Sequence, residues 1–145
     1  MKGIFILVFL SLSLINCTII TSVEDGLPIF YENESQFGKL KNVITKLSIG
    51  SNTPFLFKIK SNPTTGYQWQ IQSKLQKGII VNNNNDISGK FQRLDDEPRL
   101  AGGPGLQVFS FLSKDVGDDT IEFVYKRNWE QDPKFTYTLH VSVTV

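Results

Sequence analysis

Very few side chains of this 145-residue sequence could act as a nucleophile, a general base or a nitrogen or sulfur ligand for a metal. Cys17 is the only cysteine and His140 is the only histidine. His140 alternates with apolar residues near the C-terminus, which predicts a position on the solvated face of a strand rather than in a catalytic site. A Ser-His-Asp site would have to use this same histidine, and no Gly-x-Ser-x-Gly turn accompanies it. Zinc would lack suitable ligands. We therefore predict that the protein is not an enzyme and needs no cofactor.

Two acidic clusters offer the oxygen ligands that Ca²⁺ prefers, so a metal site has to be considered. The first is Asp95-Asp96-Glu97, and the second comprises Asp115, Asp118 and Asp119. The alternative is turn chemistry, because Asp and Gly around Val116-Gly117-Asp118 suit a tight connection between strands. We favour the turn and predict no metal site.

The most distinctive polar stretch is Asn62-Pro63-Thr64-Thr65-Gly66-Tyr67, which joins two segments of alternating apolar and polar residues. Pro63 fixes its own φ and biases Asn62 toward an extended conformation, while Gly66 permits the positive φ of a tight turn. The sequence therefore predicts a stiff, exposed wedge loop, Asn62–Gly66, that presents Thr64 and Thr65 at its tip. Such a loop has little conformational freedom to lose on docking, which favours binding over catalysis.

Two further loops have compositions that simple connections do not need. The glycine turn, Gly102-Gly103-Pro104-Gly105, has little side-chain bulk, and glycine is costly to order unless a turn or a close partner requires it. The tryptophan loop, residues 127–133, begins with Arg127-Asn128-Trp129 and lies between the last two predicted strands. Trp129 either folds back over the rim of the core or stays exposed for a partner, and both Arg and Trp are enriched at binding hot spots.

Almost all of the sequence after residue 40 alternates with a period of two, as half-buried β-strands do. The clearest segment is 135–145, where Phe, Tyr, Leu and Val alternate with Thr, His and Ser. The other predicted strand segments are 43–49, 55–60, 67–72, 78–81, 90–94 and 121–125. Short strands separated by Gly, Pro, Asn and Asp turns predict an all-β antiparallel sandwich, in which alternate connections gather at one end. The three unusual loops would then form one continuous surface.

The N-terminus predicts a targeting segment rather than part of the core. Lys2 precedes an almost continuous apolar run, Ile4–Ile15, which is typical of a secretory signal peptide and short for a transmembrane helix. We predict a leader at about residues 1–20 and a single domain over 21–145, with no A-x-A pattern to fix the cleavage bond. Leu14–Cys17 also resembles an imperfect bacterial lipoprotein box, a weaker interpretation because Asn stands where a small residue is expected.

The mature chain offers little for nucleic acids or membranes to bind. The sequence has 15 Lys and Arg against 14 Asp and Glu, and loss of a leader containing Lys2 would leave 14 of each. Loss of Cys17 with the leader would also remove thiol and disulfide chemistry. Asn33-Glu34-Ser35 is a glycosylation sequon, so Asn33 is either glycosylated in a eukaryotic secretory pathway or an unmodified loop residue. We expect a monomer.

The three loops come in the order and approximate spacing found in the chagasin-type inhibitors of cysteine peptidases, which this chain resembles. The contiguous match at Asn62–Tyr67 is the specific one, and the glycine turn and Tyr125–Trp129 strengthen it through their order. The resemblance spans roughly residues 40–145. The chain departs from the family pattern at two positions, because Asn128 stands where Pro is usual and Pro104 stands where Gly is more usual.

The resemblance implies an immunoglobulin-like sandwich with three binding loops at one end. It also implies a reversible, tight-binding inhibitor of papain-like, cathepsin-like peptidases. By position, Pro63–Gly66 would enter the active-site cleft beside the enzyme's catalytic Cys. The glycine turn would lie along one wall of the cleft, and Arg127 and Trp129 would contact the other wall near the catalytic His. The residues carried over as peptidase-binding are Asn62, Pro63, Thr64, Thr65, Gly66, Tyr67, Gly102, Gly103, Pro104, Gly105, Arg127, Asn128 and Trp129.

An exported immunoglobulin-like adhesion or carbohydrate-binding module is the alternative from a different functional class. Such a module would use Trp129 as an aromatic platform, but it gives no reason for the stiff wedge loop. For an inhibitor that carries a leader, we expect secretion or retention in lysosome-like vesicles. The two departures, Asn128 and Pro104, would alter loop stiffness and selectivity without abolishing binding.

Overall fold

The computed structural model describes residues 20–24, 26–31, 42–72, 75, 77–83, 86–94 and 103–145. Almost all of the predicted leader, the sequon at Asn33, the acidic cluster at 95–97 and Gly102 lie outside the described residues. In the part of the chain that is described, no helix is long and apolar enough to cross a membrane.

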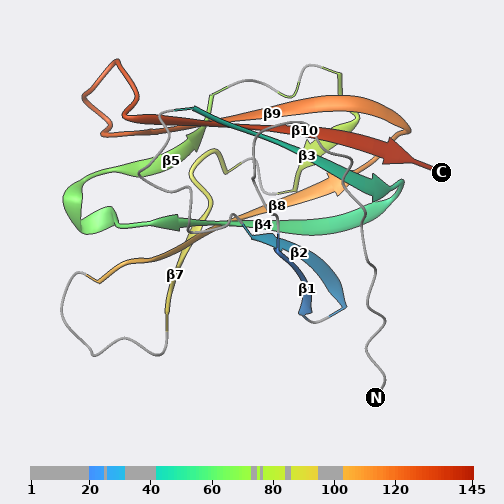
Figure 1. The fold of residues 1–145 in the computed structure, drawn as a ribbon, viewed down its shortest axis with the longest axis horizontal. Helices are drawn as coiled ribbons and strands as arrows, with labels where there is room; N and C mark the ends of the chain where they lie inside the picture. The colour runs from blue at the N-terminus through green and yellow to red at the C-terminus, as the bar shows by residue number, and fades with distance from the viewer. Residues whose placement is uncertain are drawn as a thin grey trace.

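Within the described ranges, two β-sheets stack as the two layers of a sandwich (Figure 1). The first sheet has the order β1-β2-β4-β8-β6, and β7 also pairs with β8. Its strands are β1 (Ile20–Glu24), β2 (Leu27–Tyr31), β4 (Thr53–Ser61), β6 (Ile80–Asn82), β7 (Lys90–Arg93) and β8 (Gly105–Ser113). The second sheet has the order β3-β10-β9-β5. Its strands are β3 (Asn42–Gly50), β5 (Gln68–Ile71), β9 (Gly117–Lys126) and β10 (Phe135–Thr144).

The predicted all-β, immunoglobulin-like sandwich is confirmed, and the pairing within it is mixed rather than purely antiparallel. β3 runs parallel to β10, and β2 runs parallel to β4. Both parallel pairs join strands that are distant in the sequence, since adjacent parallel strands cannot be connected by a tight hairpin. The alternation that identified the strands is a local property of each segment, so it does not indicate the direction of the neighbouring strand.

The period-two pattern of the sequence matches the burial of the side chains. Along β10, Tyr137, Leu139 and Val141 are buried, while His140 and Ser142 are exposed on the outer face. The solvated position predicted for His140 is therefore confirmed. β1, β2 and β8 were not among the predicted strand segments. β1 and β2 are short and lie before the region of clear alternation, whereas β8 follows directly on the irregular, glycine-rich stretch that ends at Gly105.

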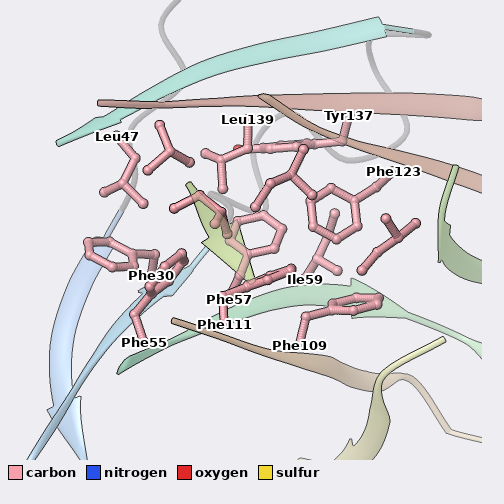
Figure 2. Packing of buried hydrophobic residues seen from close by; sticks show 14 of the residues in the cluster. Phe30, Leu47, Phe55, Phe57, Ile59, Phe109, Phe111, Phe123, Tyr137 and Leu139 are labelled. Atoms are coloured by element: carbon pink, nitrogen blue, oxygen red, sulfur yellow. The ribbon is translucent and has the colours of Figure 1, made fainter. Parts of the chain in front are cut away.

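Aromatic rings fill much of the space between the two layers (Figure 2). The ring of Phe57 lies 5.1 Å from that of Phe123 and 5.4 Å from that of Tyr137, measured between centroids. Phe109 meets Phe123 at 4.9 Å with the ring planes inclined by 64°. Edge and tilted contacts of this kind are the arrangement that aromatic pairs prefer. The rings keep the two sheets, and therefore the loops at their ends, at a set separation.

The outer face of β4 departs from the simple picture of a solvated surface. Lys58 alternates with core residues in the sequence, yet the residue is only 4% exposed. Its ammonium group donates to Gln92 Oε1 of β7 at 3.2 Å. The pairing of β7 with β8 brings Gln92 to this position, and a local sequence pattern does not reveal that contact.

Gln107 is a buried polar residue that joins the two sheets beside the wedge loop. Its Oε1 accepts the Trp69 N–H at 2.7 Å, and its Nε2 donates to the Trp69 carbonyl at 3.0 Å and to the Ser88 carbonyl at 2.7 Å. Trp69 lies in β5, the edge strand of the second sheet, so its backbone groups on the side away from β9 need partners. The Gln107 amide supplies them from the opposite sheet.

Replacing Gln107 with Leu is therefore expected to lower the free energy of unfolding by at least about 2 kcal/mol, because each buried polar group left unpaired costs about 1–3 kcal/mol. Urea denaturation of the purified protein measures this loss. The control is Thr138→Val, a near-isosteric change on the half-exposed outer face of β10, which should stay within about 0.5 kcal/mol of the wild type. A Gln107→Leu protein as stable as the control would contradict the role given to the amide.

Candidate functional site

The three loops identified in the sequence lie at one end of the sandwich. Ser61, the last residue of β4, pairs with Gly105, the first residue of β8, so the start of the wedge loop lies beside the end of the glycine turn. Gln68 of β5 pairs with Lys126 of β9, which brings the other end of the wedge loop next to the tryptophan loop. Figure 1 shows the β4–β5 turn, the β9–β10 connection and the start of β8 together at the left of the molecule. Gly102 lies outside the described residues.

The wedge loop is a single 3-10 turn closed by its own hydrogen bonds. Pro63–Thr65 form the turn, preceded by Asn62 with φ −133° and ψ 87°. The Asn62 carbonyl accepts the Thr65 N–H at 3.3 Å and the Thr65 hydroxyl at 2.7 Å, and the Pro63 carbonyl accepts the Gly66 N–H at 2.9 Å. Gly66 has φ 81°, the left-handed conformation predicted for this position. Pro63, Thr64 and Thr65 are exposed, so the loop is both stiff and accessible.

The base of the wedge loop stands on buried and half-buried aromatic side chains. The Tyr125 hydroxyl accepts the Asn62 N–H at 3.3 Å. The ring of Tyr67 stacks on Tyr125 at 5.5 Å, and Trp69 packs on Tyr125 at 5.0 Å. The Trp69 indole N–H also donates to the Lys60 carbonyl at 2.9 Å. These contacts hold both ends of the loop against β9, and Tyr67, one of the predicted binding residues, is half-buried among them.

Arg127 connects the tryptophan loop to the wedge loop. Its Nε donates to the Thr65 carbonyl at 3.1 Å, and its guanidinium carbon lies 4.4 Å from the centroid of the Tyr67 ring. Its Nη1 is 3.3 Å from Glu130 Oε1 in the same loop. The ammonium nitrogen of Lys134 lies 5.0 Å from the centroid of the same Tyr67 ring, so two cations lie over this half-buried ring.

Trp129 is exposed beside the wedge loop rather than folded over the rim of the core. Its residue exposure is 74%. A Cβ atom placed on Gly66 would lie only 3.3 Å from Trp129 Cη2, so the indole edge passes close to the glycine. The sequence left open whether Trp129 folds back over the rim of the core or stays exposed, and in the structure it is exposed.

Asn128 ties the tryptophan loop to β5. Its Oδ1 accepts hydrogen bonds from Gln68 Nε2 and Gln70 Nε2, both at 2.7 Å. The sequence placed both glutamines on the polar face of this strand but did not indicate a partner for them. Asn128 thus restrains the loop through side-chain hydrogen bonds at the position where the family pattern has Pro.

The glycine turn has a packing role that the sequence did not reveal. Gly105 is buried, and a Cβ atom there would lie 2.4 Å from the Gln92 carbonyl oxygen and 2.5 Å from Phe91 Cζ. Gly105 therefore admits the ring of Phe91, whose residue is 40% exposed. Gly103 and Pro104 are half-exposed. Phe91 adds an exposed aromatic side chain beside the glycine turn. Its place there could not be predicted, because the sequence of a short exposed strand does not indicate which distant residue it contacts.

Of the residues considered for chemistry, His140 and Asp119 lie away from the three loops and have ordinary partners, while Cys17 and the cluster at 95–97 lie outside the described residues. His140 is exposed on β10, with its Nδ1 3.0 Å from the Thr120 hydroxyl. Asp119 is buried, and its carboxylate accepts the Ile80 N–H at 3.2 Å and the Thr120 N–H at 2.8 Å. Among the described residues, no group of three or more His, Cys, Asp or Glu is placed to hold a metal ion. Asp119 lies within β9, and its hydrogen bond to Ile80 joins that strand to the start of β6.

Comparisons with known proteins identify the same fold and a family. A sequence profile of the chagasin family peptidase inhibitors, I42, matches residues 48–141, a range that includes all three loops. Among solved structures, Amebosin is 23% identical with a TM-score of 0.53, and the match covers 71% of this chain and 96% of that one. The cysteine protease inhibitor EhICP2 from Entamoeba histolytica is 20% identical with a TM-score of 0.50, covering 72% and 99%. PbICP-C, solved in complex with falcipain-2, is 18% identical with a TM-score of 0.51, covering 71% and 89%. At such identities these structures show the fold alone. A sequence search of curated proteins found no significant match.

Two features favour glycine at position 66, namely its positive φ and the nearby Trp129 ring. Three glycine-to-alanine substitutions measure their effects on stability separately. Gly50→Ala should stay within about 0.5 kcal/mol of the wild type, because Gly50 lacks a positive φ and its Cβ would meet only Thr53 Oγ1, at 3.5 Å. Gly26→Ala should cost about 1–2 kcal/mol, because φ is +79° but nothing lies within 4 Å. Gly66→Ala should cost more than Gly26→Ala, up to about 3 kcal/mol, because it adds the contact with Trp129.

Chemical denaturation of the three variants measures these differences in unfolding free energy. Equal stability of the Gly66→Ala and Gly50→Ala proteins would contradict the left-handed turn.

Proposed function

The chain belongs to the chagasin family of peptidase inhibitors, and we propose that it inhibits papain-like cysteine peptidases reversibly and tightly by occluding their active-site cleft. Two proteins of similar fold support the choice of target class, since one is described as a cysteine protease inhibitor and another was solved with falcipain-2. Membership of an inhibitor family also confirms that the protein is not an enzyme.

The observation that carries this proposal is the joined, exposed pair of loops at one end of the sandwich. The tip residues Pro63, Thr64 and Thr65 are exposed, and the turn that presents them is closed by hydrogen bonds within the loop. Trp129 stands next to this tip, held through Arg127 and Asn128. Association costs about 4–15 kcal/mol in lost motion, so loops that are already ordered retain more of their contact energy on binding.

In the proposed complex, the tip of the wedge loop enters the cleft beside the catalytic cysteine of the enzyme. The narrow 3-10 turn and its two small threonine side chains fit a cleft that accepts an extended peptide. Trp129 covers one wall, and the half-exposed Gly103 and Pro104 lie along the other. Binding of this kind needs complementary shape and hydrogen bonds, and no nucleophile, metal or cofactor from the inhibitor.

We also propose a location and an assembly state that suit this function. The apolar segment at the N-terminus would direct the chain into the secretory pathway, for secretion or for retention in lysosome-like vesicles. The mature domain would act as a monomer, because each molecule has one loop end and one cleft is filled by one wedge.

Substitution of the tip tests the proposed mode of binding. Thr64→Arg/Thr65→Arg should raise the inhibition constant against papain by about 100-fold or more, because bulky charges at a central contact remove about 3 kcal/mol of binding energy. Ser48→Arg/Thr144→Arg adds the same charges on exposed residues of β3 and β10 at the opposite end and should leave the constant unchanged. An unaltered inhibition constant in the tip variant would contradict the wedge.

Trp129 provides a second test, which separates binding from folding. Trp129→Ala should weaken papain inhibition by about 30-fold or more, as removal of an aromatic hot spot does. The same change should leave the free energy of unfolding within about 0.5 kcal/mol of the wild type, because the side chain is largely exposed. Inhibition and denaturation are measured on the same preparation. A loss of stability without a loss of inhibition would assign Trp129 to the fold instead.

A further inference from the structure

We propose that Arg127 protects the wedge loop from hydrolysis by the peptidase that it blocks, because its guanidinium holds the carbonyl oxygen of Thr65. This inference rests on the proposed function, since it concerns the fate of the same loop inside the cleft. It assigns to Arg127 a task beyond contact with the enzyme. In the proposed complex the Thr65–Gly66 peptide bond lies close to the catalytic cysteine of the enzyme, and Arg127 keeps that bond from being hydrolysed.

The chemistry of a cysteine peptidase defines what protection requires. The thiolate sulfur adds to a carbonyl carbon, and the C=O π electrons move to the oxygen, which becomes an oxyanion. The C–N bond then breaks as the amine takes up a proton, and water releases the new carboxylate from the acyl-enzyme. Addition is fast only when preorganised donors lie about 2.7–3.1 Å from the position that the oxyanion, rather than the ground-state carbonyl oxygen, will occupy. A carbonyl oxygen that is already held by another donor, in a chain that cannot extend, is a poor substrate.

The Thr65–Gly66 bond lies at the exposed tip, and its carbonyl is held from another loop. Arg127 Nε donates to the Thr65 oxygen at 3.1 Å. The guanidinium is itself restrained, by Glu130 at 3.3 Å and by the Tyr67 ring at 4.4 Å. The planar group therefore occupies one side of the oxygen, from which an oxyanion-hole donor would otherwise approach.

The leaving-group side of the same bond is restricted as well. Gly66 has φ 81°, which is incompatible with the extended chain that a cleft binds productively. The edge of the Trp129 ring passes close to Gly66, so the glycine cannot easily swing outward. Both sides of the bond thus depend on the tryptophan loop.

Two other carbonyls of the wedge loop are protected in a different way. The Asn62 oxygen accepts the Thr65 N–H and hydroxyl, and the Pro63 oxygen accepts the Gly66 N–H. These bonds close within the loop and would survive the loss of Arg127. Removal of Arg127 should therefore expose the Thr65–Gly66 bond selectively.

The experiment incubates papain with the full mature chain and compares the wild type with Arg127→Ala. Enzyme activity is followed over hours, and mass spectrometry locates any cleaved bond. The wild type should stay intact. Arg127→Ala should inhibit at first and then lose potency, as the chain is cut into one product with Thr65 at its C-terminus and another that begins at Gly66. Cleavage should be at least about tenfold faster than in the wild type, the factor that loss of one hydrogen bond from a charged donor allows.

Glu130→Gln and Thr136→Ala complete the comparison. Glu130→Gln removes the ion pair but keeps the Arg127 donor, so it should show intermediate cleavage at the same bond. Thr136→Ala removes a side-chain hydrogen bond to Asn42 on the edge of the second sheet and should behave as the wild type. Thermal unfolding of each variant checks that cleavage does not arise from global opening, which would produce cuts at many bonds.

The possible outcomes separate this inference from the proposed function. If Arg127→Ala inhibits more weakly but stays uncut, or is cut at another bond, Arg127 is a contact residue only and the inference is wrong. If the wild type fails to inhibit papain, the proposed function is wrong. The relative rates of cleavage at Thr65–Gly66 in the two proteins would still decide whether Arg127 protects that bond.

Discussion

The side-chain amide of Gln107 fastens β5 to the opposite sheet, and the arrangement of the loop end depends on that contact. β5 has only four residues and pairs on one side alone, so Trp69 would otherwise present an unpaired N–H and C=O at the edge. The side-chain amide of Gln107 forms hydrogen bonds with both of these backbone groups. β5 follows the wedge loop directly, and its polar face holds Asn128. Release of β5 would therefore loosen two loops at once.

The wedge loop and the tryptophan loop behave as one unit rather than as two independent binding elements. Arg127 reaches the Thr65 carbonyl, and the indole of Trp129 lies close to Gly66. Residues that share hydrogen bonds in this way couple energetically, so substitutions in the two loops should not be additive in binding. The glycine turn joins the unit less directly, through the backbone pairing of Gly105 with Ser61. Alanine scanning of each loop alone would overestimate its separate contribution.

Sequence patterns predicted most of the strands, with β1, β2 and β8 missed, and the positions of the three loops, because both are local properties. Alternation along β10 and the Pro and Gly residues of the wedge loop each act on their own segment of chain. The contacts that place the loops against one another could not be predicted, since they join segments about 60 residues apart in the sequence, such as Arg127 with Thr65. The contact of Phe91 with Gly105 and that of Lys58 with Gln92 also join separate strands, at the shorter separations of 14 and 34 residues. Nothing in a polar Gln or Lys marks it as the partner of a group on another strand.

Asn128 shows how the same loop can be stiffened by a different physical means. A proline at this position would restrict φ whether or not the rest of the protein is folded. Asn128 instead depends on two exposed hydrogen bonds to Gln68 and Gln70, and hydrogen bonds of this kind are worth about 1 kcal/mol each. The restraint that Asn128 supplies therefore depends on β5 being in place, whereas Arg127 restrains the same loop independently through the Thr65 carbonyl and Glu130.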